Sequence, residues 1–399
     1  MGIKKGSSYF NNIYTKKILL EELRDKFVII DLYYILHKLI RQNISLPLFY
    51  ILEFINLIEK FKHFGIKPIF VIDGRPLFQK TKKLQRTRQK CGNKLYLLLE
   101  TDNIIIDNKK AESLLKKTIA ITKEDIDNCK DLFNKLDCLY IHVNNCEGDT
   151  VIAEVASLLQ KNINLEDKDV YVYSADFDMF LYSDITHIIK DLDFENDTFK
   201  LYIKGDILNI LNITQYELIL SGFITGTDYN CGLYKATMES SIELLKEYGP
   251  FNSLEDFLDT LPKININKEV NHKILIPTYN FIDRYDLVID IFTLNNTSSI
   301  TRSSIIKFIN EQCLKIQEPK NTLQNFFNVK YVLDYIQSIT RDSYFIHKYS
   351  EKIKSYSTLQ FGFTCKFGSD SDNEYDEYDE YDAYYRYDTC NLYSYVSYL

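Results

Sequence analysis

Short apolar runs alternate with amphipathic stretches over the first 250 residues of the chain. Four of these runs are rich in β-branched and aromatic residues, which favours strands: FVIID at 27–31, PIFVID at 68–73, CLYIHV at 138–143 and VYVY at 170–173. Between them, apolar residues recur at three- and four-residue spacing, as over 47–63, which predicts helices. Strands and helices that alternate in this way form parallel sheets covered on both faces. The pattern therefore predicts an α/β fold with a mostly parallel sheet.

The rest of the pattern extends this sheet and adds helices. HIIKDLDF at 187–194 and FKLYI at 199–203 read as further strands. Thr122 opens a capping box, TKED, at the start of a helix. Later helices are predicted at about 205–211, 214–223 and 237–248, and residues 251–368 are mostly helical by pattern.

Acidic residues follow the predicted strands. In a parallel sheet the carboxyl ends of the strands share one rim, where ligand sites form. Carboxylates gathered there repel one another, so the spacing indicates a bound cation, and ligands that are all oxygen favour Mg²⁺ or Mn²⁺ over zinc. The alternative for any single acid is that it caps the next helix. The seven candidates are Asp31, Asp73, Glu147, Asp149, Asp176, Asp178 and Asp228.

The net charge of −8 is confined to one segment. Residues 370–388 hold nine acids and one Arg, which leaves 47 acids and 47 bases in the other part of the chain. Within that neutral part, residues 80–90 hold six Lys or Arg and no acid. Such a run is usually a solvated helix face. Its start seven residues after Asp73 favours instead a phosphate-binding segment that leaves the acidic rim.

Other features narrow the class of protein. No signal peptide or membrane span is expected, because the first residues lack an apolar core and no long apolar window occurs. The eight cysteines include no CxxC pair, so reduced thiols are expected and a zinc site is not. Residues 369–399, with repeated DEY triplets, are predicted to be disordered.

Taken together, these motifs resemble the flap endonucleases of the XPG-type 5′-nuclease family. The match covers about residues 1–250, in the family's order. The matching segments are MGI at 1–3, FVIIDLYYIL at 27–36, GIKPIFVIDGRP at 65–76, ITKEDIDNCKDLFNKLDCLYIHVNNCEGDTVIAE at 121–154, SADFDMFLY at 174–182 and GTDYNCG at 226–232. Here Asp149 replaces a Glu of the family, and Ala175 stands where the family has Glu.

The resemblance implies a PIN-like 5′-nuclease fold and assigns roles to residues. All seven carboxylates have counterparts among the family's metal ligands. Lys80 stands at the active-site lysine, and the arginine that follows falls between Arg86 and Arg88. Predicted DNA contacts are Gly2, Lys82, Lys83, His37 at the base-stacking Tyr position, and Gly232 in a degenerate helix–hairpin–helix at about 222–248. Residues 1–250 would be the nuclease domain, 251–368 a mainly helical region and 369–399 an acidic tail.

The function implied is hydrolysis of phosphodiesters at 5′ flaps, gaps or junctions in DNA, with two Mg²⁺ ions, for which Mn²⁺ could substitute. Departures from the family's motifs and a composition heavy in Asn, Ile, Tyr and Lys resemble the nucleases of large DNA viruses such as poxviruses. Such an enzyme would work in replication, recombination or repair, in the host cytoplasm if poxvirus-like and otherwise in the nucleus.

Two alternatives stay open. One is an inactive DNA-binding scaffold of the same fold. The other is a Mg²⁺-dependent phosphatase with an Asp-x-Asp nucleophile, against which the basic run favours a polymeric substrate. KNTLQNFF at 320–327 resembles a sliding-clamp-binding box, but Lys320 replaces its Gln, and we expect no clamp binding.

Overall fold

The computed structural model describes part of the 399-residue chain. The described residues are 6–13, 16–42, 48–74, 88–94, 96, 108–144, 146–162, 170–193, 196–230, 232–233, 236–251, 253, 256–257, 259–260, 285–295 and 297–313.

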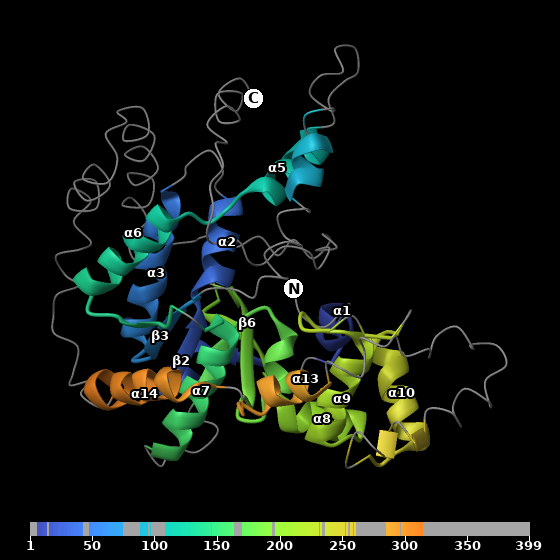
Figure 1. The fold of residues 1–399 in the computed structure, drawn as a ribbon. Helices are drawn as coiled ribbons and strands as arrows, with labels where there is room; N and C mark the ends of the chain where they lie inside the picture. The colour runs from blue at the N-terminus through green and yellow to red at the C-terminus, as the bar shows by residue number, and fades with distance from the viewer. Residues whose placement is uncertain are drawn as a thin grey trace.

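The centre of the molecule is a seven-stranded sheet with the order β1-β7-β6-β5-β2-β3-β4 (Figure 1). Parallel pairs join β2 to β3 and β5, β3 to β4, and β5 to β6, whereas β7 pairs antiparallel with β6 and β1. The predicted α/β fold with a mostly parallel sheet is therefore confirmed. The strands are β1 (Lys16–Leu19), β2 (Phe27–Asp31), β3 (Lys67–Ile72), β4 (Leu139–His142), β5 (Val170–Tyr173), β6 (His187–Asp193) and β7 (Thr198–Ile203).

Alternate residues of the inner strands enter two separate cores. In β2, Phe27 and Ile29 pack into one core, and Val28 and Ile30 pack into the other. All five residues of this strand are buried, as expected of a central strand covered on both faces. The period of two in the strands thus divides the apolar side chains between two helical layers.

One layer consists of α2 (Leu32–Gln42), α3 (Phe49–His63) and α6 (Lys123–Lys135). Its core is aromatic. Phe70 of β3 stacks on Phe133 of α6 with ring centroids 4.1 Å apart, and Phe54 of α3 contacts both rings edge-on. The predicted capping box is present, because Thr122 Oγ1 accepts the Asp125 amide and the Asp125 carboxylate accepts the Thr122 amide.

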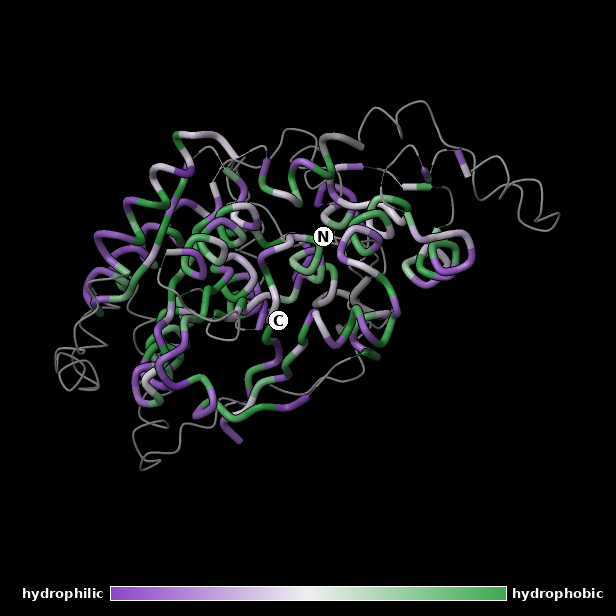
Figure 2. The backbone as a smooth tube through the Cα atoms, turned by 90° about the horizontal axis from the view of Figure 1, so that it is seen from below, coloured by the Kyte–Doolittle hydropathy of each residue, from purple (hydrophilic) through white to green (hydrophobic). Residues whose placement is uncertain are grey.

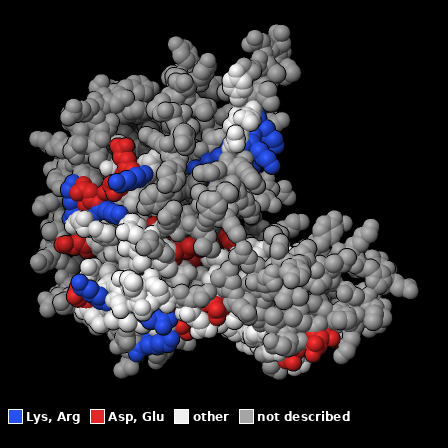
Figure 3. Space-filling model, in the orientation of Figure 1, with Lys and Arg blue, Asp and Glu red and all other residues white. Residues whose placement is uncertain are grey.

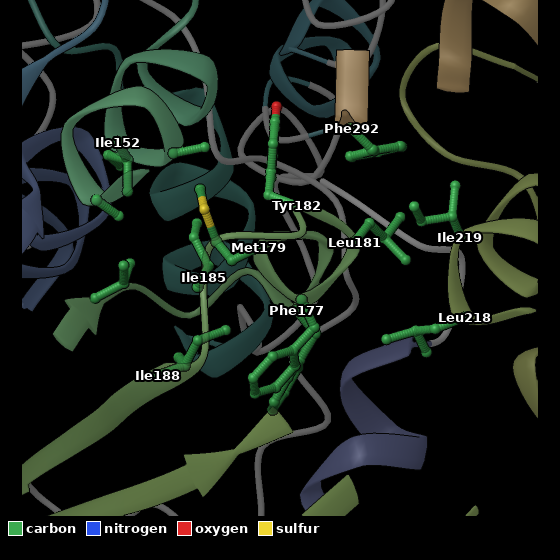
Figure 4. Close-up of a cluster of buried hydrophobic side chains, with 14 of the residues drawn as sticks. Ile152, Phe177, Met179, Leu181, Tyr182, Ile185, Ile188, Leu218, Ile219 and Phe292 are labelled. Carbon is green, nitrogen blue, oxygen red and sulfur yellow. The ribbon is translucent and has the colours of Figure 1, made fainter. Parts of the chain in front are cut away.

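The other layer contains more helices and draws on both halves of the chain. Helix α7 lies on the sheet. Of the two orange helices in Figure 1, α14 lies beside α7 and α13 lies beside α9. Their buried residues share one core with the strands, so described residues on both sides of residue 250 pack together (Figure 4). This layer comprises α7 (Gly148–Asn162), η3 (Phe177–Leu181), α8 (Lys204–Leu211), α9 (Gln215–Thr225), α10 (Met238–Tyr248), α13 (Tyr285–Phe292), α14 (Ser299–Phe308) and the π-helical turn η4 (Ile309–Cys313).

The sequence pattern missed the first elements of the chain. These are α1 (Gly6–Asn11), β1 and the 3-10 turn η1 (Leu20–Leu23). In β1 only Ile18 is buried, so this four-residue edge strand has no apolar run from which it could be predicted. Helix α5 (Asn108–Thr118) comes shortly before the helix that Thr122 caps. Outer helices carry alternating hydrophobic and hydrophilic residues (Figure 2), which is the signal that identified most of them.

No single helix in the described segments is long and apolar enough to span a membrane, although α8 and α9, bent by 78°, meet that test as a pair. Among the described cysteines, the free thiols are Cys91, Cys129, Cys138, Cys146 and Cys313. The predicted clamp-box segment at 320–327 and the acidic tail at 369–399 lie outside the described residues.

The aromatic core gives a direct test of the packing. Phe54 is fully buried and meets Tyr50, Phe70 and Phe133 edge-on. Phe54→Ala should therefore lower the free energy of unfolding by about 3–5 kcal/mol, measured by urea denaturation. Ile210→Ala removes a side chain that is 62% exposed and should change it by less than about 0.5 kcal/mol. Equal midpoints for the two variants would contradict this core.

Candidate active site

Strand register brings the predicted acids to one rim of the sheet. Asp31, the last residue of β2, pairs with Val71 of β3, and its neighbour Ile30 pairs with Tyr173 of β5. Asp73 follows Val71 by two residues, and adjacent strands lie about 4.8 Å apart. The carboxyl ends of β3, β2 and β5 therefore place their acids side by side.

A buried serine links three of these acids. Ser174 follows β5, and its Oγ donates a hydrogen bond to Asp31 Oδ2 at 3.1 Å. The same Oγ accepts the backbone amide of Asp176 at 3.1 Å, and Asp176 Oδ1 accepts the amide of Asp178 at 3.0 Å. All four side chains are buried. Sequence reasoning missed Ser174, although it stands between the strand and the two aspartates.

A second group forms where α7 begins. Glu147 precedes the helix and Asp149 is its second residue, so both lie at the helix entry. Gly148 between them leaves room for Asp73, since a Cβ at this glycine would lie 1.7 Å from Asp73 Oδ1. Glu147 Oε2 accepts a hydrogen bond from the Tyr229 hydroxyl at 2.7 Å.

The pKa of the Cys146 thiol is raised by its burial and by the negative charges around it. Its pKa is raised to about 12, first by burial and then by the charges of four carboxylates: Glu147, Asp73, Glu154 and Asp149. Glu154 was not among the predicted site residues. It lies on α7, one and a half turns beyond Asp149, and is buried.

A tight turn after α9 carries the seventh acid, and the residue after that acid contacts this group. Thr227 and Asn230 close the turn, because Asn230 Oδ1 accepts the Thr227 amide and its side-chain nitrogen donates to Phe223 O. Asp228 is half-buried within the turn, and the next residue, Tyr229, reaches Glu147. The GTDYN motif therefore brings α9 to the acidic rim.

The helix-capping interpretation also holds for two of the acids. Asp31 Oδ1 accepts the amide of Tyr34 at 3.1 Å, and Asp176 caps the 3-10 helix η3. Across the described residues, no three His, Cys, Asp or Glu side chains converge as a ready-made metal site. The all-oxygen donor set fits Mg²⁺ or Mn²⁺ chemically, but side chains that now accept local hydrogen bonds would have to rotate toward the ion.

The predicted basic and DNA-binding residues are only partly described. Gly2, Lys80, Lys82, Lys83 and Arg86 lie outside the described residues, whereas Arg88 is half-exposed. In Figure 3, basic side chains lie near α5, and acidic ones lie nearer the middle of the same face.

His37 is buried in α2, with 2% of its surface exposed, and neither ring nitrogen has a hydrogen-bond partner among the described residues. Burial, followed by the charges of Arg41, Arg88 and the chain's N-terminus, holds its pKa well below the usual value. The ring must therefore be uncovered before it can stack on a base.

Gly232 occupies a position that only glycine suits. Its φ is +65°, and a Cβ there would lie 2.3 Å from the carbonyl oxygen of Thr225. Leu233 N donates to Ile224 O at 2.7 Å, which closes the hairpin between α9 and α10. Helices α9 and α10 pack against each other, and the helix–hairpin–helix itself stays a prediction.

Comparison with known proteins identifies similar sequences. Residues 1–94 match the XPG N-terminal domain. Flap endonuclease 1 of Methanosarcina barkeri is 26% identical over 270 residues, which cover 60% of this chain and 74% of that protein. Flap endonuclease 1 of Entamoeba histolytica is 26% identical over 299 residues, covering 70% and 74%. Together these matches support a relationship between this chain and the XPG and flap endonuclease family.

Solved structures establish the fold. The catalytic core of Rad2 in complex with a DNA substrate superposes with a TM-score of 0.55 at 20% identity, covering 88% of this chain and 98% of that one. The Holliday junction-resolving enzyme GEN1, in complex with product DNA and a Mg²⁺ ion, gives 0.53 at 16% identity, covering 83% and 72%. The predicted PIN-like fold is confirmed, whereas the roles of individual site residues stay predictions.

Gly148 offers a test of the arrangement around Asp73. Gly148→Ala should displace the Asp73 carboxylate within a crowded, negatively charged region and cost about 1–3 kcal/mol of unfolding free energy. Gly92→Ala is the matched control, because a Cβ at this helical glycine meets nothing within 4 Å and should stabilise by up to about 1 kcal/mol. Urea denaturation of both variants decides it. A Gly148→Ala protein as stable as Gly92→Ala would show that Asp73 does not lie there.

Proposed function

We propose that this chain is a structure-specific DNA nuclease, similar to flap endonucleases, that hydrolyses phosphodiesters at 5′ flaps or junctions. The observation that carries the proposal is the rim, where strand register and the α7 entry gather the acids of β2, β3, β4–α7 and β5. Buried carboxylates at such density are costly unless a cation or a proton compensates them. The named relatives are flap endonucleases, which supports a nuclease over other users of acidic sites.

Each of two Mg²⁺ ions would be held by one group of acids. We assign one group to Asp31, Asp176 and Asp178, joined through Ser174, and the other to Asp73, Glu147, Asp149 and Asp228. When bound, such ions lower the pKa of an attacking water and stabilise charge on the leaving 3′-oxygen. Mn²⁺ would serve with the same oxygen donors.

The chain's other residues would position the DNA. Lys80 and either Arg86 or Arg88 would offset the charge of the scissile phosphate, and Lys82, Lys83 and Gly2 would contact the backbone. Gly232 would bring the α9–α10 hairpin close to duplex phosphate, since it carries no side chain. His37 would contact a base after it is uncovered.

The biological setting that we propose is the processing of replication, recombination or repair intermediates. An origin in a large DNA virus, with work in the host cytoplasm, rests on the chain's composition and on its departures from the family's motifs. Residues 1–250 would form the nuclease domain and the acidic tail a separate segment.

Cleavage of labelled DNA tests the proposal. Flap, nicked and single-stranded substrates, labelled at either 5′ or 3′ end, are incubated with Mg²⁺ or with EDTA. We expect Mg²⁺-dependent cleavage near the flap junction by the wild type and none by Asp176→Asn, which controls for contaminating nucleases. DNA binding without cleavage would favour the inactive scaffold. Hydrolysis of small phosphomonoesters alone would favour the phosphatase.

The carboxylate cluster should also limit stability when no metal is present. A pair of carboxylates about 4 Å apart repels by about 4 kcal/mol at an effective dielectric near 20. Asp176→Asn or Asp178→Asn removes one charge at nearly constant shape, and Asn caps η3 as well as Asp does. Each variant should melt at a higher temperature than wild type in EDTA, because one repelling charge is gone. Mg²⁺ stabilises by binding only the folded protein, and each variant should gain less from it because it has lost one carboxylate ligand.

Asp206→Asn is the matched control, since Asp206 is an exposed acid in the first turn of α8. It should change neither the melting temperature in EDTA nor the gain from Mg²⁺. If the Asp176 and Asp178 variants behave like this control, the acids do not share a metal site.

The basic run should act on turnover more than on affinity. Lys80→Ala, or Arg86→Ala combined with Arg88→Ala, should slow single-turnover cleavage about ten- to a hundredfold, because one charge-assisted contact is worth about 1.5–3 kcal/mol. Duplex affinity, measured by fluorescence anisotropy, should fall less. Unchanged single-turnover rates in both variants would identify the run as a solvated face.

A further inference from the structure

Two buried tyrosines connect the acidic rim to the helices behind it. The Tyr229 hydroxyl donates to Glu147 at 2.7 Å, and the Tyr182 hydroxyl lies 3.4 Å from Thr150 Oγ1, one residue after Asp149.

A phenylalanine from the C-terminal region holds both rings. Phe292, the last residue of α13, is 1% exposed. Its ring centroid lies 5.1 Å from that of Tyr182 and 5.8 Å from that of Tyr229, with interplanar angles of 74° in both cases. Figure 4 shows its ring beside Tyr182, among the apolar side chains of this layer. Edge-to-face contacts of this kind fix the orientation of a ring beyond what burial alone does.

An ion pair from α14 holds α7 at a second point. Arg302 donates to Glu154 Oε1 from Nη2 at 2.7 Å and from Nε at 3.1 Å, and Nη2 also donates to Leu294 O at 3.2 Å. The Glu154 side chain is only 2% exposed. Without Arg302 its charge would be left uncompensated beside the acids that surround Cys146.

We propose that α13 and α14 are a positioning clamp for the acidic rim: Phe292 fixes the ring of Tyr229, which holds Glu147, and Arg302 fixes α7, which carries Asp149. The inference rests on the proposed function, since it takes Glu147 and Asp149 as metal ligands. It gives residues 285–313 a part in the active site that their sequence does not suggest. Partners that orient ligands in this way commonly account for ten- to a hundredfold of metal affinity.

Metal affinity of the full-length protein tests the clamp without DNA. Mn²⁺ titration followed by electron paramagnetic resonance gives the dissociation constant, at a temperature where circular dichroism shows every variant folded. Tyr229→Phe deletes one hydroxyl at constant shape and should weaken Mn²⁺ binding about tenfold. Phe292→Leu and Arg302→Met should weaken it severalfold, and Arg302→Lys should restore part of the loss because it keeps the charge.

Matched substitutions in α14 separate positioning from stability. Phe308→Leu makes the same change at another buried ring, and Lys307→Met removes an exposed charge from the same helix. Both should leave Mn²⁺ affinity unchanged, even where Phe308→Leu lowers the melting temperature. Equal losses of affinity in the controls would mean that general destabilisation is the cause, and would overturn the clamp.

The outcomes also distinguish this inference from the proposed function. Wild type that binds Mn²⁺ while Tyr229→Phe, Phe292→Leu and Arg302→Met bind it equally well would overturn the clamp and leave the metal site standing. Wild type that binds no Mn²⁺ would overturn the proposed function, and the clamp with it.

Discussion

Repulsion among buried carboxylates is the constraint on which the rest of this structure depends. The acids lie at the carboxyl ends of the strands and at the entry of α7, and four carboxylates act together on the thiol of Cys146. Local donors partly offset that repulsion. Ser174 and the amides of Tyr34 and Asp178 serve one group of acids, and the Tyr229 hydroxyl serves the other. A compensating cation would complete what these neutral donors begin.

The fold places this constraint where it can be supported from several sides. Central strands buried on both faces fix the register of the acids, because a slip by one residue would exchange the two cores. Helix α7 presents its first turn to the rim while its apolar side packs on the sheet. The hairpin after α9 and the C-terminal helices then add Tyr229, Phe292 and Arg302 from distant parts of the chain.

Sequence reasoning predicted the elements whose signal is local. Apolar runs in the sequence predict the strands β2 to β7, and the acids were selected because they follow such runs. The edge strand β1 has one buried residue and was missed. Ser174, the Tyr229–Glu147 bond and the Arg302–Glu154 pair could not be predicted, because the last two join residues 82 and 148 positions apart through tertiary packing. The resemblance to a family supplied roles, but it did not supply these contacts.

The most direct test of the account is the position of the metal itself. Crystals of the protein grown or soaked with Mn²⁺ would locate the ion by anomalous scattering. The account predicts Mn²⁺ at the carboxyl rim, between the Asp31–Asp176–Asp178 group and the Asp73–Glu147–Asp149 group, with oxygen ligands only. Well-occupied Mn²⁺ elsewhere on the protein, with the rim acids still bound to Ser174 and Tyr229 alone, would contradict it.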